Sequence, residues 1–228
     1  AIDEAVDAVA RLRRKAPHVL ANIGYLSLTA RLSALGWLGL RWGKAAQRAE
    51  AALNASEGLF EKLLAEAAGN FVLVANGSNL RHAGLGQEID SRRIVIRLNG
   101  FPNAPEDLGS RVDVWMRPLD AHHVPYKAPA NLRLTVASGC DLQHRFSDGV
   151  PAITKLIAMG APLTTVPVAL YHRLFAQIEA APSIGLLGAA WVADATGRAL
   201  NTRQAVGYAL HENSKDVSHY YDRTKKGA

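Results

Sequence analysis

The stretch Phe71-Val72-Leu73-Val74-Ala75-Asn76-Gly77-Ser78-Asn79 joins a short apolar run to a polar turn that contains a glycine. An apolar run of this length is typical of a buried strand. Similar runs predict further strands at 94–98, 112–116, 132–136 and 164–168. Helical patterns occur at 151–159, 169–180 and 186–195. Alternating strands and helices predict an α/β, Rossmann-like fold, in which a mostly parallel sheet carries helices on both faces.

The part of the chain before the first strand has a different composition. Residues 1–69 are rich in Ala, Leu, Glu, Lys and Arg, and apolar residues such as Leu59, Leu63 and Leu64 recur at helical spacing. We therefore expect a helical N-terminal region over 1–69 and an α/β domain over 70–228. A hydrophobic stretch at 19–40 contains Asn, Ser, Thr, Arg and three glycines, which makes it too polar for a membrane span.

Charge and cysteine content limit the classes of function. The 228 residues carry 26 Lys and Arg against 20 Asp and Glu, a net charge of +6. This excess favours an anionic partner: a nucleic acid, an acidic membrane surface, or a phosphorylated or carboxylated small molecule. Cys140 is the only cysteine, so an intrachain disulfide and a multi-cysteine zinc site are excluded, and a reducing compartment is predicted.

The polar turn at 76–79 is the first candidate for chemistry. In an open parallel sheet, ligands bind outside the carboxyl ends of the strands, and a glycine there lets backbone N–H groups approach a phosphate. Two asparagines add uncharged donors and acceptors, so the turn suits a ribose or a phosphate. The following Gly84-Leu85-Gly86 is only a weak dinucleotide fingerprint, because Ile89 stands where the third glycine belongs.

The region from Val72 to Arg117 resembles the large sialylmotif of the eukaryotic-type sialyltransferases, glycosyltransferase family 29. The matching segments are Asn76-Gly77-Ser78-Asn79-Leu80, Gly84-Leu85-Gly86-Gln87-Glu88-Ile89-Asp90, Arg97-Leu98-Asn99 and Leu108-Gly109-Ser110-Arg111. Two later motifs of the family follow in the same order. Ala181-Pro182-Ser183-Ile184-Gly185-Leu186-Leu187 and Val206-Gly207-Tyr208-Ala209 are similar to the start and end of the small sialylmotif, and His219-Tyr220-Tyr221-Asp222 is similar to the third motif.

The resemblance implies an enzyme with a variant of the GT-A fold, whose nucleotide-sugar-binding catalytic domain is 70–228. It implies inverting, metal-independent transfer of an acidic sugar from a CMP-linked donor to a glycan hydroxyl. His219 would hold the donor phosphate and stabilise the departing CMP, as a histidine near neutrality can. The resemblance places donor binding at Asn76, Gly77, Ser78, Asn79, Asn99, Ser183, Ile184, Gly185 and Tyr220. No cofactor or metal is expected, and no Asp-x-Asp occurs in the chain.

Departures from the family pattern bear on the donor sugar. The family has Ser or Thr where this chain has Ile184, which removes a hydroxyl, and the order Gly77-Ser78 is reversed. The cysteines that link the large and small motifs in animal members are absent. A bacterial-type enzyme would explain this, with either a sialic acid-like nonulosonic acid or Kdo as the donor sugar.

The general base is not identified. The family supplies it from a histidine with a glutamate five positions later, downstream of the third motif, and we expect that motif beyond Ala228 or another base in its place. His211 and Asp216 have the same spacing, but they lie upstream.

The acceptor stays open among a glycan, a lipid-linked glycan and a glycoprotein. We expect a cytoplasmic location, with the inner face of the membrane as an option. Trp37 and Trp42, close to basic residues, would then be candidates for peripheral membrane contact, although packing onto the main domain is the favoured interpretation.

Two other classes of function remain as alternatives. A dinucleotide-binding oxidoreductase predicts an acidic residue at the end of the second strand, where this chain has Arg97-Leu98-Asn99. A nucleic-acid or membrane-binding module needs clustered basic and aromatic residues, whereas the basic residues here are scattered, so no nucleic-acid partner is expected. Arg97 and Asp90 are expected to be structural residues, and His122 and His123 to be surface residues. His82 is expected either to face the ligand or to lie on the surface.

Overall fold

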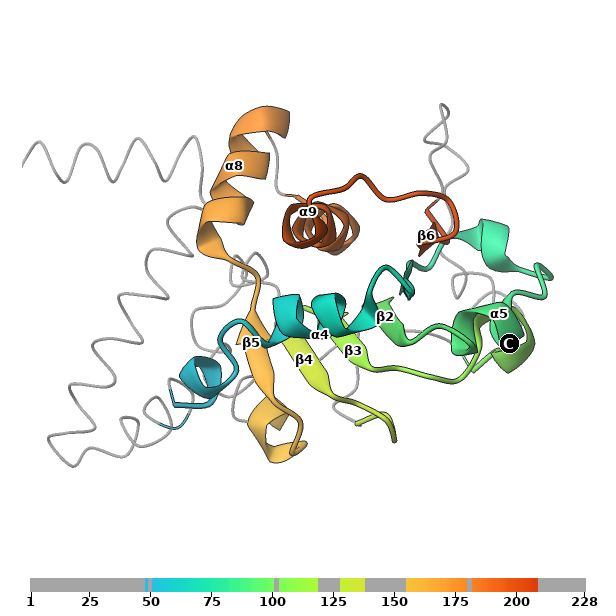
Figure 1. The fold of residues 1–228 in the computed structure, drawn as a ribbon, viewed down its shortest axis with the longest axis horizontal. Helices are drawn as coiled ribbons and strands as arrows, with labels where there is room; N and C mark the ends of the chain where they lie inside the picture. Colours follow the sequence, from blue (N-terminus) through green and yellow to red (C-terminus); the bar gives the residue numbers. More distant parts are fainter. Residues whose placement is uncertain are drawn as a thin grey trace, which may run out of the picture.

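The structure is a computed structural model that describes residues 48, 51–100, 103–118, 128–137, 155–179 and 182–208. Its centre is a six-stranded, fully parallel sheet with the order β5-β4-β3-β2-β1-β6 (Figure 1). The strands are β1 (Phe71–Val74), β2 (Ile94–Leu98), β3 (Val114–Arg117), β4 (Leu134–Ala137), β5 (Leu163–Thr165) and β6 (Ala205–Val206). The helices are α4 (Leu59–Ala67), the 3-10 helix η1 (Ser78–Leu80), α5 (Gly86–Asp90), α6 (Pro105–Leu108), α8 (Val168–Ile178) and α9 (Ile184–Thr196). Within these residues, the α/β prediction is confirmed.

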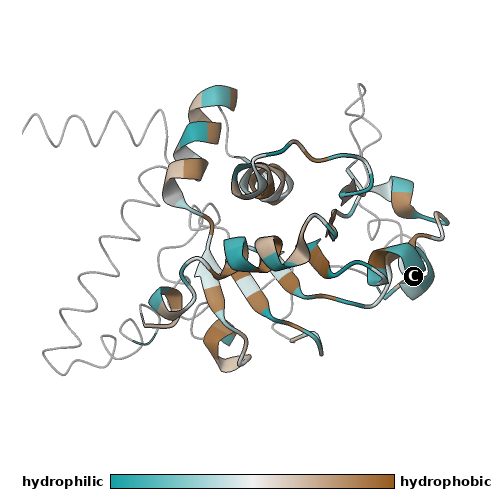
Figure 2. Ribbon diagram, viewed as in Figure 1, coloured by the Kyte–Doolittle hydropathy of each residue, from teal (hydrophilic) through white to brown (hydrophobic). Residues whose placement is uncertain are grey.

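The four strands β1 to β4 are buried on both faces, which explains why they read as continuous apolar runs. Every residue of β1, β2, β3 and β4 is buried. A parallel sheet requires this, because its crossover connections place chain on both faces. Figure 2 shows hydrophobic residues along the strands and in α9, and hydrophilic residues on the outer sides of the helices.

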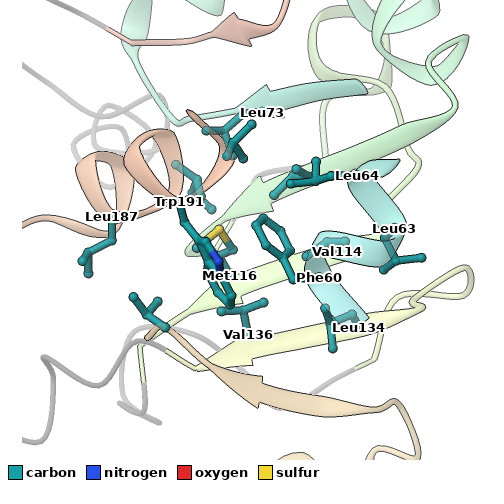
Figure 3. Packing of buried hydrophobic residues seen from close by; sticks show 14 of the residues in the cluster. Phe60, Leu63, Leu64, Leu73, Val114, Met116, Leu134, Val136, Leu187 and Trp191 are labelled. Atoms are coloured by element: carbon teal, nitrogen blue, oxygen red, sulfur yellow. The ribbon is translucent and has the colours of Figure 1, made fainter. Parts of the chain in front are cut away.

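The larger core lies between one face of the sheet and α4, α8 and α9. Helix α4 contributes Phe60, Leu63, Leu64 and Ala67, all buried, as its apolar spacing predicts. The Phe60 and Trp191 rings lie 4.2 Å apart between centroids, above strand residues that include Val114 and Met116 (Figure 3). The Trp191 indole N–H also donates to Glu61 at 2.7 Å. Helix α4, which precedes residue 70, is therefore part of the same core as the sheet.

The opposite face of the sheet carries a smaller cluster. Val72, Val74 and Val95 of the sheet pack there with apolar residues of η1, α5 and α6. Leu80, Ile89 and Leu108 are the buried residues of those three short elements. These short helices thus cover the sheet beside the turn that follows β1.

Differences from the predicted elements have local causes. The expected strand at 164–168 is β5 at Leu163–Thr165, because Pro167, which has no N–H to give to a ladder, directly precedes α8. Strand β6 was not predicted, since two half-buried residues carry no periodicity. In the expected helix at 151–159, residues 155–158 are helical and 151–154 lie outside the described residues. Among the described helices, none has the length and apolarity needed to cross a membrane.

Candidate functional site

The carboxyl ends of β1, β2 and β6 meet the start of α9 at one edge of the sheet. Strand β1 is paired with β2 on one side and with β6 on the other, so the residues that follow all three strands are neighbours. Gly188 of α9 lies over the ends of β2 and β3, since a Cβ there would be 3.4 Å from Leu98 and 3.1 Å from Met116. The edge therefore collects the candidate residues from three separate sequence segments.

Asn76, directly after β1, is tied to the neighbouring strand. Its side-chain amide nitrogen donates to Leu98 O at 3.0 Å and to Gly100 O at 2.7 Å, and the residue is only 7% exposed. Both amide hydrogens are thus used to join the chain after β1 to the chain after β2. Only the Oδ1 atom remains for a ligand, and that atom accepts hydrogen bonds rather than donating them.

Gly77 makes the closest approach in the turn. Its N–H donates to Gly207 O at 2.8 Å, and a Cβ on Gly77 would lie 2.4 Å from that oxygen and 2.5 Å from the Asn79 Oδ1 atom. Ser78 then opens η1, and Asn79 is exposed. Of the two asparagines in the turn, Asn79 is therefore the one whose side chain faces solvent.

Asn99 directly follows β2 and has a left-handed conformation, with a φ of 56°. Asparagine tolerates this region better than most residues. The Asn99 N–H donates to Met116 O at 2.8 Å, and its carbonyl accepts from the Trp115 indole at 2.6 Å. These bonds fix the backbone, and among the described residues the Asn99 side chain makes no hydrogen bond.

Helix α9 begins at the same edge with a side-chain cap. The Ser183 hydroxyl accepts from Leu186 N at 3.2 Å, and the Ser183 carbonyl accepts from Leu187 N at 2.9 Å. The N–H groups of Ile184 and Gly185 have no partner within α9, as is general for the first turn. The Ile184 side chain is only 7% exposed and belongs to the large core, so this position contributes packing rather than a hydroxyl.

Tyr208 was not among the site residues predicted from sequence. Its hydroxyl donates to Gly185 O at 2.9 Å, and burial raises the pKa of the phenol well above its usual value of 10.0. The only signal in the sequence was its position directly after Gly207, in the segment similar to the end of the small sialylmotif.

Two carboxylates lock α5 and α6 together beside the turn. Asp107 of α6 accepts from His82 N at 2.9 Å and from Gly84 N at 3.1 Å, in the loop before α5. In return, Asp90 of α5 accepts from Ser110 N at 2.8 Å and from Arg111 N at 2.9 Å, in the loop after α6. The predicted structural role of Asp90 is confirmed.

The two helices also touch through a glycine. A Cβ on Gly86, the first residue of α5, would overlap Pro105 O of α6 at 1.8 Å. Much of the segment that resembles the large sialylmotif therefore makes contacts that hold the loop in place.

Arg97 is a structural residue as well, as predicted. The residue is 1% exposed, and its guanidinium donates through Nε to Arg111 O at 3.0 Å and through Nη2 to Leu108 O. Burial lowers the pKa of Arg97 to about 10, against the opposing effect of the Asp90 charge. Its charged group thus ties β2 to the loop after α6.

Several predicted residues lie outside the described residues. These are His219 and Tyr220 of the third motif, Trp37 and Trp42, Cys140, His122, His123, His211 and Asp216. His82 is exposed. In the described part of the chain, no three His, Cys, Asp or Glu side chains form a group that could hold a metal ion.

Comparisons with known proteins show a similarity over the segment that contains much of this site. Residues 44–128 match the sequence model of glycosyltransferase family 29 (sialyltransferase). The matched segment contains β1, the turn at 76–79, the α5–α6 pair and β3. Over that segment, which is less than half of the chain, the protein is similar to glycosyltransferase family 29.

A search of curated proteins found no match. Among solved structures, the chain is similar to one described as a mammalian sialyltransferase, with 16% sequence identity and a TM-score of 0.47. That similarity covers 67% of this chain and 58% of the other, so this chain spans little more than half the length of that protein.

Proposed function

We propose that this protein transfers an acidic sugar from a CMP-linked donor to a glycan hydroxyl, by an inverting and metal-independent reaction. The observation that carries the proposal is the convergence of the turn at 76–79, Asn99 and the start of α9 at one sheet edge. Ligands of open parallel sheets bind at such an edge, outside the carboxyl ends of the strands. The turn and Asn99 belong to the segment that matches the family model.

Two groups of residues at this edge are proposed to bind different parts of the CMP-linked sugar. On one side, the Asn79 and Asn99 side chains supply amide donors and acceptors for the nucleotide, and Asn76 offers its Oδ1 atom to a donor such as a ribose hydroxyl. On the other side, the N–H groups of Ile184 and Gly185 stand at the positive end of the α9 dipole, which favours the phosphate or the sugar carboxylate. Gly77 lies in the same turn as Asn79, and Ser183 caps α9.

The reaction we propose is a single in-line displacement at the anomeric carbon of the donor sugar. The acceptor hydroxyl attacks as CMP departs, so the bond to the phosphate oxygen breaks while the bond to the acceptor oxygen forms. His219 and Tyr220 are proposed to contact the donor, with His219 stabilising the negative charge that develops on the leaving phosphate. The base that takes the acceptor proton is not assigned.

We extend the proposal to the donor sugar and the setting. Ile184 supplies no hydroxyl where the family has Ser or Thr, and on that ground we propose a related nonulosonic acid or Kdo as the donor sugar, in a bacterial-type enzyme. We further propose a cytoplasmic enzyme that acts on a glycan, a lipid-linked glycan or a glycoprotein. Trp37 and Trp42 are its candidate contacts with the inner membrane face, and a flotation assay with anionic vesicles would test them.

The alternative of a dinucleotide-binding oxidoreductase has no support. It needs a carboxylate at the end of β2 to bind a ribose, but β2 ends in Arg97 and Leu98 and is followed by Asn99. Arg97 is occupied with backbone carbonyls, so it is not directed at a ligand either.

A thermal-shift titration with CMP, CDP, UDP and NAD tests the proposed function. At a hundredfold excess over its dissociation constant, CMP should stabilise the protein by about 2.7 kcal/mol. Asn79→Ala should lose this stabilisation, whereas Gln87→Ala, an exposed change on α5, should retain it. An equal response to NAD, or none to CMP, would overturn the proposal. Addition of EDTA during an activity assay with CMP-linked sugars tests metal independence.

A further inference from the structure

We propose that Tyr208 is a positioning residue, whose hydroxyl holds the first turn of α9 against the turn after β1 and thereby sets the affinity of the site for its nucleotide. The ligand in this inference rests on the proposed function, but the contact between Tyr208 and α9 does not.

The contact with α9 has two parts. The phenol hydroxyl donates to Gly185 O at 2.9 Å. The ring also packs against the bare Cα of Gly185, because a Cβ on that residue would lie 3.3 Å from the Tyr208 Cε1 atom. A side chain at Gly185 would therefore press on the ring, and glycine lets the two segments come together.

The other end of this connection is the turn after β1. Tyr208 follows Gly207, whose carbonyl accepts from Gly77 N at 2.8 Å. Gly207 has a φ of 75°, and a Cβ on it would lie 2.5 Å from Ala75 O. The dipeptide Gly207-Tyr208 thus contacts the turn with its backbone and the start of α9 with its side chain.

The Tyr208 hydroxyl can donate its hydrogen bond to Gly185 O at any pH in the neutral range. Burial raises the pKa of Tyr208, so the hydroxyl remains a protonated donor across the neutral range. Gly185 O belongs to the first turn of α9, where helices fray most readily, and a further donor on this carbonyl opposes fraying. The N–H groups of Ile184 and Gly185 are then held in place before a ligand arrives, which lowers the entropic cost of binding.

Tyr208→Phe tests the inference, because it removes the hydroxyl and keeps the ring. Tyr171→Phe is the matched control, since it removes the hydroxyl of a buried tyrosine in α8, away from the site. Two quantities are measured on the full chain: hydrogen exchange of the amides of Leu186 to Gly188 without ligand, and the dissociation constant for CMP. For Tyr208→Phe we expect exchange about fivefold faster and CMP binding about fivefold weaker, the effect of one net hydrogen bond. Tyr171→Phe should leave both within about twofold of wild type.

The outcomes separate this inference from the proposed function. If hydrogen exchange of these amides is unchanged in Tyr208→Phe, the proposed link between Tyr208 and α9 is overturned, whether or not the affinity for CMP changes. Faster exchange with unchanged CMP affinity would overturn its effect on binding. If the wild-type protein does not bind CMP, the proposed function fails, and the exchange data alone decide whether Tyr208 holds the helix.

Discussion

The backbone N–H of Gly77 donates a 2.8 Å hydrogen bond to the carbonyl oxygen of Gly207. This bond continues the pairing of β1 with β6, in which Ala75 N donates to Val206 O at 2.9 Å, into the turn that holds the candidate site. It brings a segment that resembles the large sialylmotif against one that resembles the end of the small sialylmotif. The candidate site therefore depends on the close approach of two backbones.

Gly77→Ala should destabilise the protein more than Gly84→Ala. Gly77 has a φ of −67°, which any residue adopts, so a Cβ there is excluded by contacts and not by backbone strain: Gly207 O would lie 2.4 Å away and the Asn79 Oδ1 atom 2.5 Å away. Gly84 has a φ of 63° and open space around it, so alanine there has only a backbone cost. We expect losses of about 3 kcal/mol for Gly77→Ala and about 1 kcal/mol for Gly84→Ala, measured by urea unfolding. Equal losses would show that the contact with Gly207 is not tight.

Asn76 and Asn79 should respond differently to substitution. Asn76→Asp replaces two donated hydrogen bonds with a buried carboxylate facing the Leu98 and Gly100 carbonyls, so we expect a loss of about 3 kcal/mol in unfolding free energy. Asn79→Ala removes an exposed side chain and should change stability by less than about 0.5 kcal/mol while it weakens CMP binding. Urea unfolding and calorimetric titration measure the two effects. A stable Asn76→Asp protein would contradict the structural role of Asn76.

Asp90 should make stability depend on pH in the acid range. Desolvation raises the pKa of Asp90, but hydrogen bonds from Ser110 and Arg111, together with the Arg97 charge, outweigh it and leave the pKa below its usual 3.8. The ionised Asp90 carboxylate therefore stabilises the folded protein fully above about pH 4. This stabilisation is lost as the pH falls through the pKa that Asp90 has in the folded state. The free energy of unfolding of the wild type and of Asp90→Asn is measured from pH 7 to pH 2. The difference between the two proteins should become smaller as the pH falls. A difference that stays constant over this range would exclude Asp90 as its source.

Arg97→Lys should be strongly destabilising despite the conserved charge. The guanidinium reaches the carbonyls of Leu108 and Arg111 at once, which a single ammonium group does not do. We expect a loss of about 2 kcal/mol in unfolding free energy, since one buried carbonyl loses its donor. Arg93→Lys, at an exposed position, is the control and should have little effect. Similar melting temperatures for both variants would argue against the role given to Arg97.

Much of the fold was predictable because the four strands β1 to β4 are buried on both faces. Their apolar runs mark β1 and β2 to within a residue, and β3 and β4 to within about two residues, where the runs fade into polar ends. Strand β6 was not predictable. It is two residues long and is defined by its pairing with β1 and by the approach of Gly207 to Gly77, which is a relation between distant segments.

The composition of the site was less predictable than its location. The sequence placed Asn76 and Asn79 in the same turn, but it could not show that the Asn76 amide is used within the protein while Asn79 is exposed. Nor could it show that Ile184 is directed into the core, since one helix position faces the sheet or the ligand depending on packing. The role of Tyr208 could not be predicted for the same reason, because its hydrogen-bond partner Gly185 lies in another motif.

Amide chemical shifts measured by NMR during a CMP titration would test the central claim most directly. The claim is that the nucleotide binds where the carboxyl ends of β1 and β2 meet the start of α9. The predicted result is a set of saturable shifts at Asn79, Asn99 and the amides of Ile184 and Gly185, with little change at Asn70, at the amino end of β1. Saturable shifts confined to the amino ends of the strands, or none at all, would contradict the claim.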